Sequence, residues 1–377
     1  MQALEYPGSE TLVINTSTAP GSQPIIRPNA IIKADSLSFL IWDVADFKKQ
    51  EEFMQDFGML THSKSSSELY MHGYEGSPYL YYGRKAKKSK FVGIGFTVNE
   101  KSDLSTLSQA TGQPIEKLNR PGGGSVVRLM DPNGVVIEVC HGIKQLKKID
   151  TRRDILNTNT RNNIVRINEG QRPPLIASPV LDIGHCVTGT NDFEGTTTWY
   201  MKHLGLIPTD VLCLEDGSPT VTFMRLDRGD KPSDHHAVVV GKGGGEGYLH
   251  SAYEVVDMDA VAQGQQFLKM KKKYKHFWGI GRHILGSQVF DYWYDPHGFE
   301  FEHYADGDVY TASHPTEYHP LDTGNIYAWG HDLPAAMFAL KPAQILSMIK
   351  GLFNGQVTFS WIKLAKKAVS RSPRPWL

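Results

Sequence analysis

The chain has 377 residues, more than twice the roughly 150 residues of a typical domain, so we expect two domains with a hydrophobic core each. Its 40 lysine and arginine residues balance 40 aspartate and glutamate residues, and this zero formal charge offers no general field for binding nucleic acid. The three cysteines, Cys140, Cys186 and Cys213, are too few for a disulfide framework, which favours a reducing, cytoplasmic location.

The N-terminal residues 1–29 lack the apolar core of a secretory signal, and we expect a loosely packed arm there. No uninterrupted run of about 18 apolar residues occurs in the chain, so the sequence predicts no integral membrane span.

A turn motif occurs twice. Asp131-Pro132-Asn133-Gly134, with Glu138 after it, recurs as Asp295-Pro296-His297-Gly298, with Glu302 after it. Apolar or aromatic residues precede each copy and an alternating stretch follows it. This pattern predicts a β-hairpin in each place, with a glycine that tolerates positive φ in the turn.

Two further pairs of segments match between the halves. The predicted helix at 53–59 resembles that at 200–206, since each ends on a glycine and follows an Asp-Phe step. The predicted strand at 93–98 resembles that at 250–255. The hairpins after each helix argue against a doubly wound nucleotide-binding fold. The chain therefore contains four similar units, each a strand, a helix and several further strands, near residues 37–83, 90–142, 180–240 and 247–305.

Comparison of the repeats isolates three polar residues in the second half, His185, His250 and Glu302. The first half has Phe39 and Gly93 where the second has the two histidines. A single histidine on a strand is usually a packed or surface residue. Two imidazoles and one carboxylate at repeat-equivalent strand positions, however, form the facial triad that holds Fe(II) with open coordination positions.

The second half resembles the type I extradiol ring-cleavage dioxygenases of the vicinal oxygen chelate superfamily, which include catechol 2,3-dioxygenase and dihydroxybiphenyl dioxygenase. Three segments carry the resemblance: 183–185, 249–255 and 281–302, the last with His283 and Tyr292 at the family spacing. The resemblance extends over about residues 35–310 and is weak in the first half, where the metal site is lost.

The resemblance implies an α+β fold of four βαβββ units, paired into two vicinal oxygen chelate domains that are each an open mixed β-barrel. The expected divisions are an N-terminal arm (1–34), an N-terminal domain without a metal site (35–142), a linker (143–174), a catalytic domain (175–310) and a C-terminal extension (311–377).

The resemblance also implies an activity. His185, His250 and Glu302 would bind Fe(II), with Mn(II) as the alternative, and the enzyme would use O2 to cleave the ring of a small aromatic diol beside its vicinal hydroxyls. His283 and Tyr292 would line the substrate pocket and hydrogen-bond the substrate oxygens. We further expect a homo-oligomer.

A histidine before the second ligand acts as acid/base in this family, and the chain offers His235 and His236. The strand pattern after them favours His236, whereas the distance to His250 favours His235. Successive side chains of a strand face opposite ways, so only one of the two can face the pocket.

Other functions of the superfamily are alternatives. An isomerase or lyase would often replace one histidine ligand by a second carboxylate, and a drug-sequestering module would need no triad. A third alternative keeps the ligands but acts on a substrate other than a catechol. Apolar residues at 284–286, where some family members carry polar ones, predict fewer polar contacts to the substrate.

Residues around the site and in the C-terminal extension carry weaker signals. We expect core packing for most of the apolar residues near the site and an exposed or outward-facing position for the polar residues of the second hairpin. The apolar residues near the site are Met224, Phe290, Trp293 and Tyr294, and the polar residues of the second hairpin are His297, Glu300 and His303.

The C-terminal extension is basic with apolar residues between its charges. This pattern fits a helix on a membrane surface or on another subunit, although packing on the core is favoured.

Overall fold

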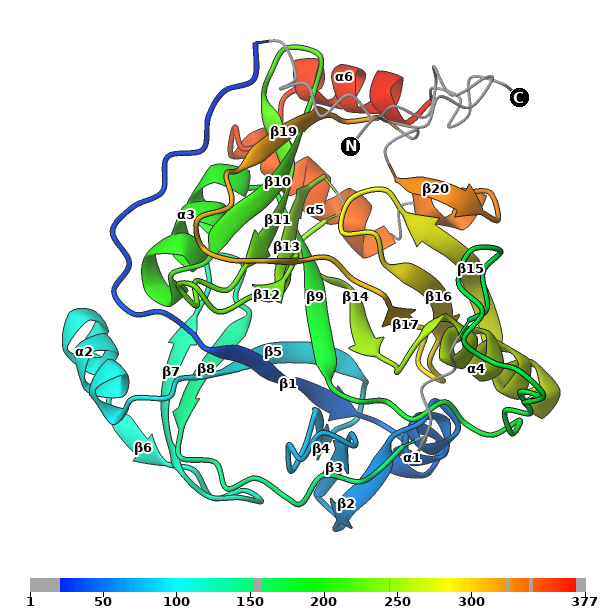
Figure 1. Cartoon of the computed structure of the whole chain (residues 1–377). Coiled ribbons are helices and arrows are strands. Elements are labelled where there is room, and N and C mark those ends of the chain that lie inside the picture. The colour runs from blue at the N-terminus through cyan, green and yellow to red at the C-terminus, as the bar shows by residue number, and fades with distance from the viewer. Residues whose placement is uncertain (1–20, 152–157, 244, 323–325, 339–341, 371–377) are drawn as a thin grey trace.

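The computed structural model describes residues 21–151, 158–243, 245–322, 326–338 and 342–370, which form two mixed β-sheets with helices on their outer faces (Figure 1). The first sheet has eight strands in the order β2-β3-β4-β1-β5-β8-β7-β6. Its strands are β1 (Ser36–Val44), β2 (Leu60–Lys64), β3 (Glu68–His72), β4 (Tyr81–Lys85), β5 (Lys90–Thr97), β6 (Ile115–Lys117), β7 (Ser125–Met130) and β8 (Val136–His141). Helices α1 (Phe47–Asp56) and α2 (Lys101–Thr111) belong to it.

The second sheet repeats this arrangement and adds a strand at each edge, giving the order β19-β10-β11-β13-β9-β14-β17-β16-β15-β20. Its strands are β9 (Ile183–Thr190), β10 (Ile207–Cys213), β11 (Pro219–Arg225), β13 (Val238–Lys242), β14 (Gly247–Glu254), β15 (Lys275–His283), β16 (Val289–Tyr294), β17 (Glu300–Ala305), β19 (Glu317–Pro320) and β20 (Tyr327–Gly330). Its helices are α3 (Phe193–Leu204) and α4 (Met258–Lys271), and strands β12 (Ser233–Asp234) and β18 (Val309–Tyr310) pair separately.

Strand register confirms the repeat equivalences. His185 on β9 pairs with Ala252 on β14, which in turn pairs with Glu302 on β17. In the first sheet Phe39 pairs with Gly95, and Gly95 pairs with Glu138. His250 stands two residues before Ala252, as Gly93 stands before Gly95. Four βαβββ units in two open, mixed sheets are therefore confirmed.

Local signals explain why the units form where the sequence predicts them. The Asp-Phe steps are helix starts, because Asp46 accepts hydrogen bonds from the amides of Lys48 and Lys49 at the N-terminus of α1, and Asp192 accepts from Gly195 at that of α3. Gly205 ends α3 with a φ of 70°. Each Asp-Pro-x-Gly segment is a hairpin turn in which the aspartate accepts two backbone amides of its own loop.

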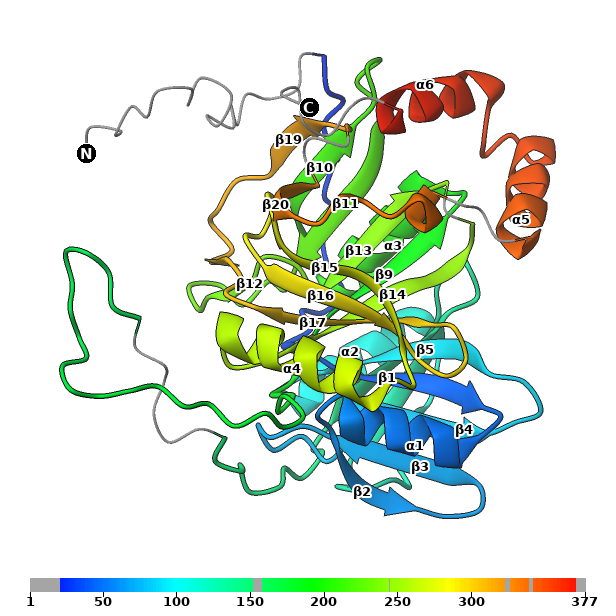
Figure 2. The ribbon, with the colours of Figure 1, turned by 90° about the vertical axis from the view of Figure 1, so that its right-hand side faces the viewer.

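The two sheets share one core. Trp42 on β1 is 1 % exposed and packs against Tyr248, Phe299 and Phe301 of the second half. The helices α1 and α4 lie side by side (Figure 2), where Asp56 accepts a hydrogen bond from Tyr274. The first half therefore packs against β14 and β17, the strands that carry two of the predicted ligands.

The arm is more firmly held than the sequence analysis expects. Residues 1–20 lie outside the described residues, but Arg27 forms an ion pair with Asp227 at 2.7 Å. Farther along, Ile31 and Ala34 bond to the last turn of α3 through their backbone amides. The expectation of a loose arm is wrong for residues 21–29, because the backbone amides of Gln23 and Ile25 also donate to groups of the second half.

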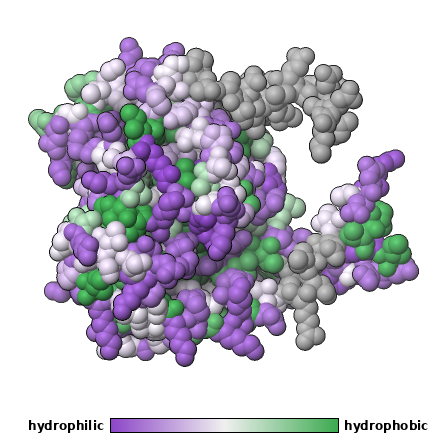
Figure 3. All heavy atoms as spheres, turned by 60° about the vertical axis from the view of Figure 1, so that its left-hand side comes forward, coloured by the Kyte–Doolittle hydropathy of each residue, from purple (hydrophilic) through white to green (hydrophobic). Residues whose placement is uncertain are grey.

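Residues 158–176, in the segment between the sheets, project from the body (Figure 2), and Figure 3 shows apolar side chains on this projection. Ile167 is its most exposed apolar residue, at 72 %.

The helices α5 (Pro342–Phe353) and α6 (Phe359–Val369) follow β20. Asn191 bonds to Ser347 on the inner face of α5, whereas Leu346 and Phe353 face outward. The favoured interpretation, that the apolar face of this extension packs on the core, is wrong for α5. Of the helices in the described ranges, none combines the length and hydrophobicity that crossing a bilayer requires.

Candidate metal centre and catalytic cavity

The three predicted ligands meet on adjacent strands of the second sheet. His185 comes from β9, His250 from β14 and Glu302 from β17. Nε2 of His185 lies 3.2 Å from Oε2 of Glu302, and Nε2 of His250 lies 3.5 Å from the same oxygen. One ligand atom from each residue can be chosen so that all three lie within 4.8 Å of one another. The fold thus places two imidazoles and one carboxylate at distances that a single ion can bridge.

The chemistry of this cluster fits a divalent cation. Both carboxylate oxygens of Glu302 are buried and accept no hydrogen bond, an arrangement that is costly unless a positive charge compensates it. Burial raises the pKa of Glu302, but the His185 and His283 imidazoles outweigh this and lower the pKa below its ordinary range. Burial lowers the pKa of His250 to about 3. A charged carboxylate beside neutral imidazole is a donor set that iron(II) and manganese(II) both accept.

His283 and Tyr292, predicted to line the pocket, do lie beside this cluster. Nε2 of His283 is 3.1 Å from the Tyr292 hydroxyl, and its Nδ1 is 2.8 Å from the carbonyl oxygen of Ile326. A carbonyl can only accept, so Nδ1 carries the proton and Nε2 accepts from the tyrosine hydroxyl. Burial raises the pKa of Tyr292 well above its ordinary value, which keeps this phenol neutral.

The structure separates the two candidate acid/base histidines. His236 lines the cavity, and its ring lies 4.1 Å, centroid to centroid, from that of His185. His235 is fully buried behind it, with Nδ1 at 2.8 Å from Nδ1 of His236. Burial, together with the nearby His185 and His235, lowers the pKa of His236 well below its ordinary value. The neighbouring histidines therefore face opposite ways, and His236 is the one that a substrate can reach.

The cavity at this site has a volume of about 370 Å³, and its wall is mostly apolar. Strands β10, β11 and β13 contribute Leu212, Phe223 and Val239. Two described parts of the C-terminal segment also line the cavity, with Met337 from a 3-10 helix at Ala335–Phe338 and Gln344 of α5. Sequence reasoning missed this contribution because nothing in the local pattern of the extension indicates which surface it contacts.

The corresponding place in the first half is filled by arginine. Glu138, the equivalent of Glu302, bonds both guanidinium ends of Arg120 and also Nε of Arg128. The Arg120 guanidinium lies 4.1 Å from the centre of the Tyr82 ring, and Phe39 stands where His185 would be. A fixed positive charge thus satisfies this buried carboxylate without a metal.

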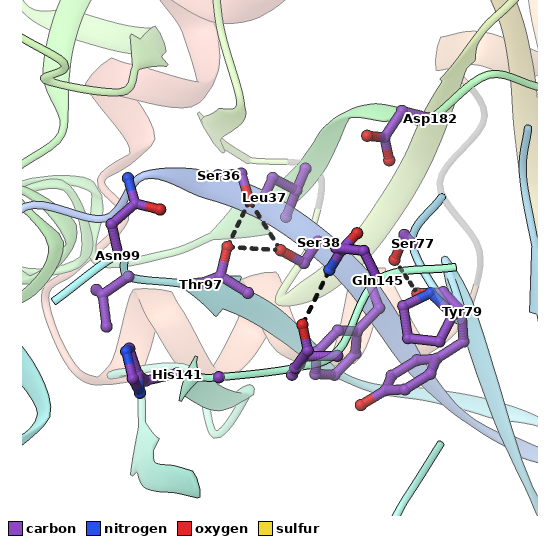
Figure 4. Close-up of a pocket in the computed structure, with 15 residues that line it drawn as sticks. Ser36, Leu37, Ser38, Ser77, Tyr79, Thr97, Asn99, His141, Gln145 and Asp182 are labelled. Atoms are coloured by element: carbon purple, nitrogen blue, oxygen red, sulfur yellow. Dashed lines mark hydrogen bonds between the residues drawn. The ribbon is translucent and has the colours of Figure 1, made fainter. Parts of the chain in front are cut away.

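A second cavity, of about 440 Å³, lies beside β1 and β5 (Figure 4). Its hydroxyl groups bond one another, since Thr97 lies 2.6 Å from Ser36 and 3.1 Å from Ser38. Neither of the two groups of potential metal ligands among the described residues lies there. This cavity has no set of side chains comparable to that around His236.

Two expectations for the second hairpin are wrong. His303 is fully buried, stacks on Phe57 of the first half and lies 2.6 Å from its carbonyl oxygen, because the packing of the halves covers this face of β17. Glu300 lines the cavity rather than pointing away from it. Tyr294 also lines the cavity, whereas the other apolar residues named with it, Met224, Phe290 and Trp293, are core residues as expected.

Comparison with known proteins supports the resemblance on independent grounds. The chain matches no family model. It is 27% identical over 329 residues to metapyrocatechase 2 of Cupriavidus necator, covering 85% of this chain and 97% of that protein.

Two solved structures show the fold. The Mn(II)-bound glyoxalase of Novosphingobium aromaticivorans has a TM-score of 0.68 at 21% identity, covering 82% of this chain and 96% of that one. Homoprotocatechuate 2,3-dioxygenase of Brevibacterium fuscum, in complex with 3,4-dihydroxyphenylacetate, has a TM-score of 0.66 at 18% identity, covering 84% and 95%. The predicted vicinal oxygen chelate fold and the resemblance to extradiol dioxygenases are confirmed.

Proposed function

We propose that this chain, a relative of the extradiol ring-cleavage dioxygenases, uses a divalent metal and O2 to cleave the ring of a catechol-type substrate beside its two hydroxyls. One observation carries the proposal. His185, His250 and Glu302 converge, neither glutamate oxygen accepts a hydrogen bond, and the two histidines line the same cavity as His236, His283 and Tyr292. Iron(II) is the metal we propose, with manganese(II) as the alternative, because this ligand set accepts either.

The residues around the cluster have separable tasks. When bound by His185, His250 and Glu302, the metal would supply a place where the two substrate oxygens and dioxygen meet and exchange electrons. His236, with its neutral imidazole, would take a proton from one substrate hydroxyl and return it later. The Tyr292 oxygen would accept a hydrogen bond from the substrate, because its own proton is directed at His283.

The expected reaction is tested by oxygen uptake of the iron(II)-loaded enzyme over a panel of monocyclic and bicyclic catechols, with absorbance of the ring-opened product as a second readout. Uptake with at least one catechol should disappear in His250→Ala. The variant His62→Ala, a histidine of the first half that lies outside the cavity, should keep it. Tight metal binding without uptake on any catechol would move the assignment to the non-oxidative isomerases and lyases of the same fold.

We propose further that the substrate is uncharged. Among the described residues that line the cavity, none is a lysine or arginine, and Glu300 is the one carboxylate. A substrate carboxylate would be buried there without a partner, which is costly. Apolar side chains such as Val187, Phe277 and Leu285 would instead pack against a hydrocarbon substituent.

This argument predicts a substrate ranking. The kcat/KM for an alkyl- or aryl-substituted catechol should exceed that for 3,4-dihydroxyphenylacetate, the ligand of the Brevibacterium fuscum enzyme, by at least about tenfold, since about 1.4 kcal/mol of uncompensated desolvation is enough for that factor. Steady-state kinetics with both substrates on one preparation measures it. Equal or reversed values would contradict the proposed apolar site.

Self-association is also proposed, as the sequence analysis expects. The projecting linker and the outer face of α5 expose Ile167, Leu346 and Phe353, which water solvates poorly and a second copy of the chain could cover. Sedimentation velocity at micromolar concentration distinguishes an oligomer from a monomer.

A further inference from the structure

A line of buried polar side chains continues from His236 away from the cavity. Nδ1 of His236 lies 2.8 Å from Nδ1 of His235, and Nε2 of His235 lies 2.6 Å from Oδ2 of Asp210. On the far side, Nε2 of His319 lies 2.8 Å from Oδ1 of the same carboxylate. None of these four residues is more than 6 % exposed. The line runs from the cavity through β10 to the edge strand β19.

The charge of Asp210 determines where the protons lie. Burial raises the pKa of this carboxyl, but the hydrogen bonds from His235 and His319 outweigh burial and lower the pKa to about 2. Asp210 is therefore an acceptor on both oxygens, and each imidazole that contacts it carries a proton on Nε2. His235 in its neutral form then has a lone pair on Nδ1.

The contact between the two histidines follows from this assignment. A hydrogen bond between two ring nitrogens needs one proton, and His235 Nδ1 has none to give. His236 must therefore donate from Nδ1, which leaves the lone pair of His236 on Nε2, the nitrogen that remains for the cavity. This is the form of histidine that can accept a proton from a substrate hydroxyl.

We infer that Asp210 and His235 are positioning residues that hold His236 in the tautomer with an unprotonated Nε2. The inference rests on the proposed function in so far as it assigns this tautomer a use. The same logic operates where a buried aspartate fixes the tautomer of a catalytic histidine in serine proteases. His319 supplies the second donor to Asp210, so the extension beyond residue 310 contributes to the line through β19.

The alternative, a second metal site at Asp210, Glu317 and His319, is less consistent with the contacts. These residues offer ligand atoms within 4.8 Å of one another. However, each oxygen of Asp210 already accepts an imidazole N–H, and His319 would have to lose the Nε2 proton that it donates. The hydrogen bonds from His235 and His319 satisfy both oxygens of Asp210 without an ion.

Asp210→Asn is the first test. The asparagine amide can accept on only one atom, and its NH2 group forces the imidazole that it faces to accept instead. If that imidazole is His235, its proton moves to Nδ1, and His236 must then carry its proton on Nε2, the wrong tautomer. We expect kcat to fall by at least about 100-fold with KM changed less than about threefold, given that the corresponding serine-protease change costs about 10⁴ in kcat.

Two variants at His235 separate positioning from packing. In His235→Asn the amide oxygen takes the place of Nδ1 and can still accept from His236, whereas His235→Leu fills the space without an acceptor. We expect the asparagine variant to retain at least about tenfold more kcat than the leucine variant. His72→Asn, at a buried histidine of the first half, is the control for changes that act only on folding, and its kcat should be unchanged.

The tautomer can be read without any turnover. Long-range proton–nitrogen NMR of the full-length protein labelled at histidine should show His236 protonated on Nδ1 in the wild type and on Nε2 in Asp210→Asn. A wild-type His236 protonated on Nε2, an unchanged kcat in Asp210→Asn although its His236 is protonated on Nε2, or equal losses in the two His235 variants would each overturn the inference. Because the NMR result does not depend on oxygen uptake, failure of the proposed dioxygenase activity is distinguishable from failure of the positioning role.

Discussion

Replacing Glu302 by glutamine is expected to weaken binding of divalent iron or manganese by more than about 100-fold, because loss of a partner that merely orients a ligand already costs about 10- to 100-fold. The substitution keeps the shape of the side chain and removes only its charge. Oxygen uptake at limiting metal should fall by at least the same factor. Metal titration of the purified variant, followed by equilibrium dialysis, measures the affinity directly.

The same substitution should not unfold the chain. The fold lowers the pKa of Glu302 and so favours its charged form, but the neutral glutamine keeps the shape of the side chain and can donate from its amide to Nε2 of His185, which lies 3.2 Å from Oε2 of Glu302. We expect the metal-free variant to remain folded, with a Tm within about 5 °C of that of the metal-free wild type. A lower Tm with unchanged metal affinity would mean that Glu302 is a structural residue and not a ligand.

Glu138→Gln, the equivalent change in the first half, should have the opposite effect. Glu138 is 2 % exposed and pairs with Arg120 and Arg128, so its loss leaves the charge of Arg120, whose side chain is only 11 % exposed, without a full partner. Removing one member of a buried ion pair typically costs 3–5 kcal/mol, and the glutamine oxygen keeps one acceptor, so we expect a loss of about 3 kcal/mol in the free energy of unfolding. Denaturant unfolding followed by circular dichroism measures it.

The two substitutions form a matched pair at equivalent positions of the repeat. Glu138→Gln should leave the number of metal ions bound per chain unchanged, whereas Glu302→Gln should lower it. We infer one metal centre at Glu302 and a site at Glu138 where arginine takes the place of the metal. This inference would be contradicted if both variants bound less metal, or if both lost stability while binding as much metal as the wild type.

The sequence predicts those features of the structure that depend on local or repeated signals. The aspartate caps, the glycines that end helices and the Asp-Pro-x-Gly turns act within a few residues, and their recurrence sets the register of the sheets. Once Phe39 and His185 are aligned, strand pairing places His250 and Glu302 next to His185. This is why three residues far apart in the chain could be predicted as one cluster.

Contacts that depend on how distant segments cross one another were beyond prediction. The burial of His303 depends on the packing of the halves, and the contribution of the C-terminal extension to the cavity wall depends on where Met337 lies. Asp210 carries a signal in the sequence, since it is the one charged residue in the otherwise uncharged stretch 207–213. A lone carboxylate in a buried strand needs a partner, but the sequence does not say that His235 and His319 supply it.

The most direct test of the central claim is the stoichiometry of the reaction. An oxygen electrode and absorbance of the ring-opened product are followed together for the iron(II)-loaded enzyme with an uncharged, substituted catechol. The account predicts one O2 consumed per ring opened and no hydrogen peroxide released. Ring opening without O2 consumption, or O2 consumed to peroxide with the ring intact, would contradict it.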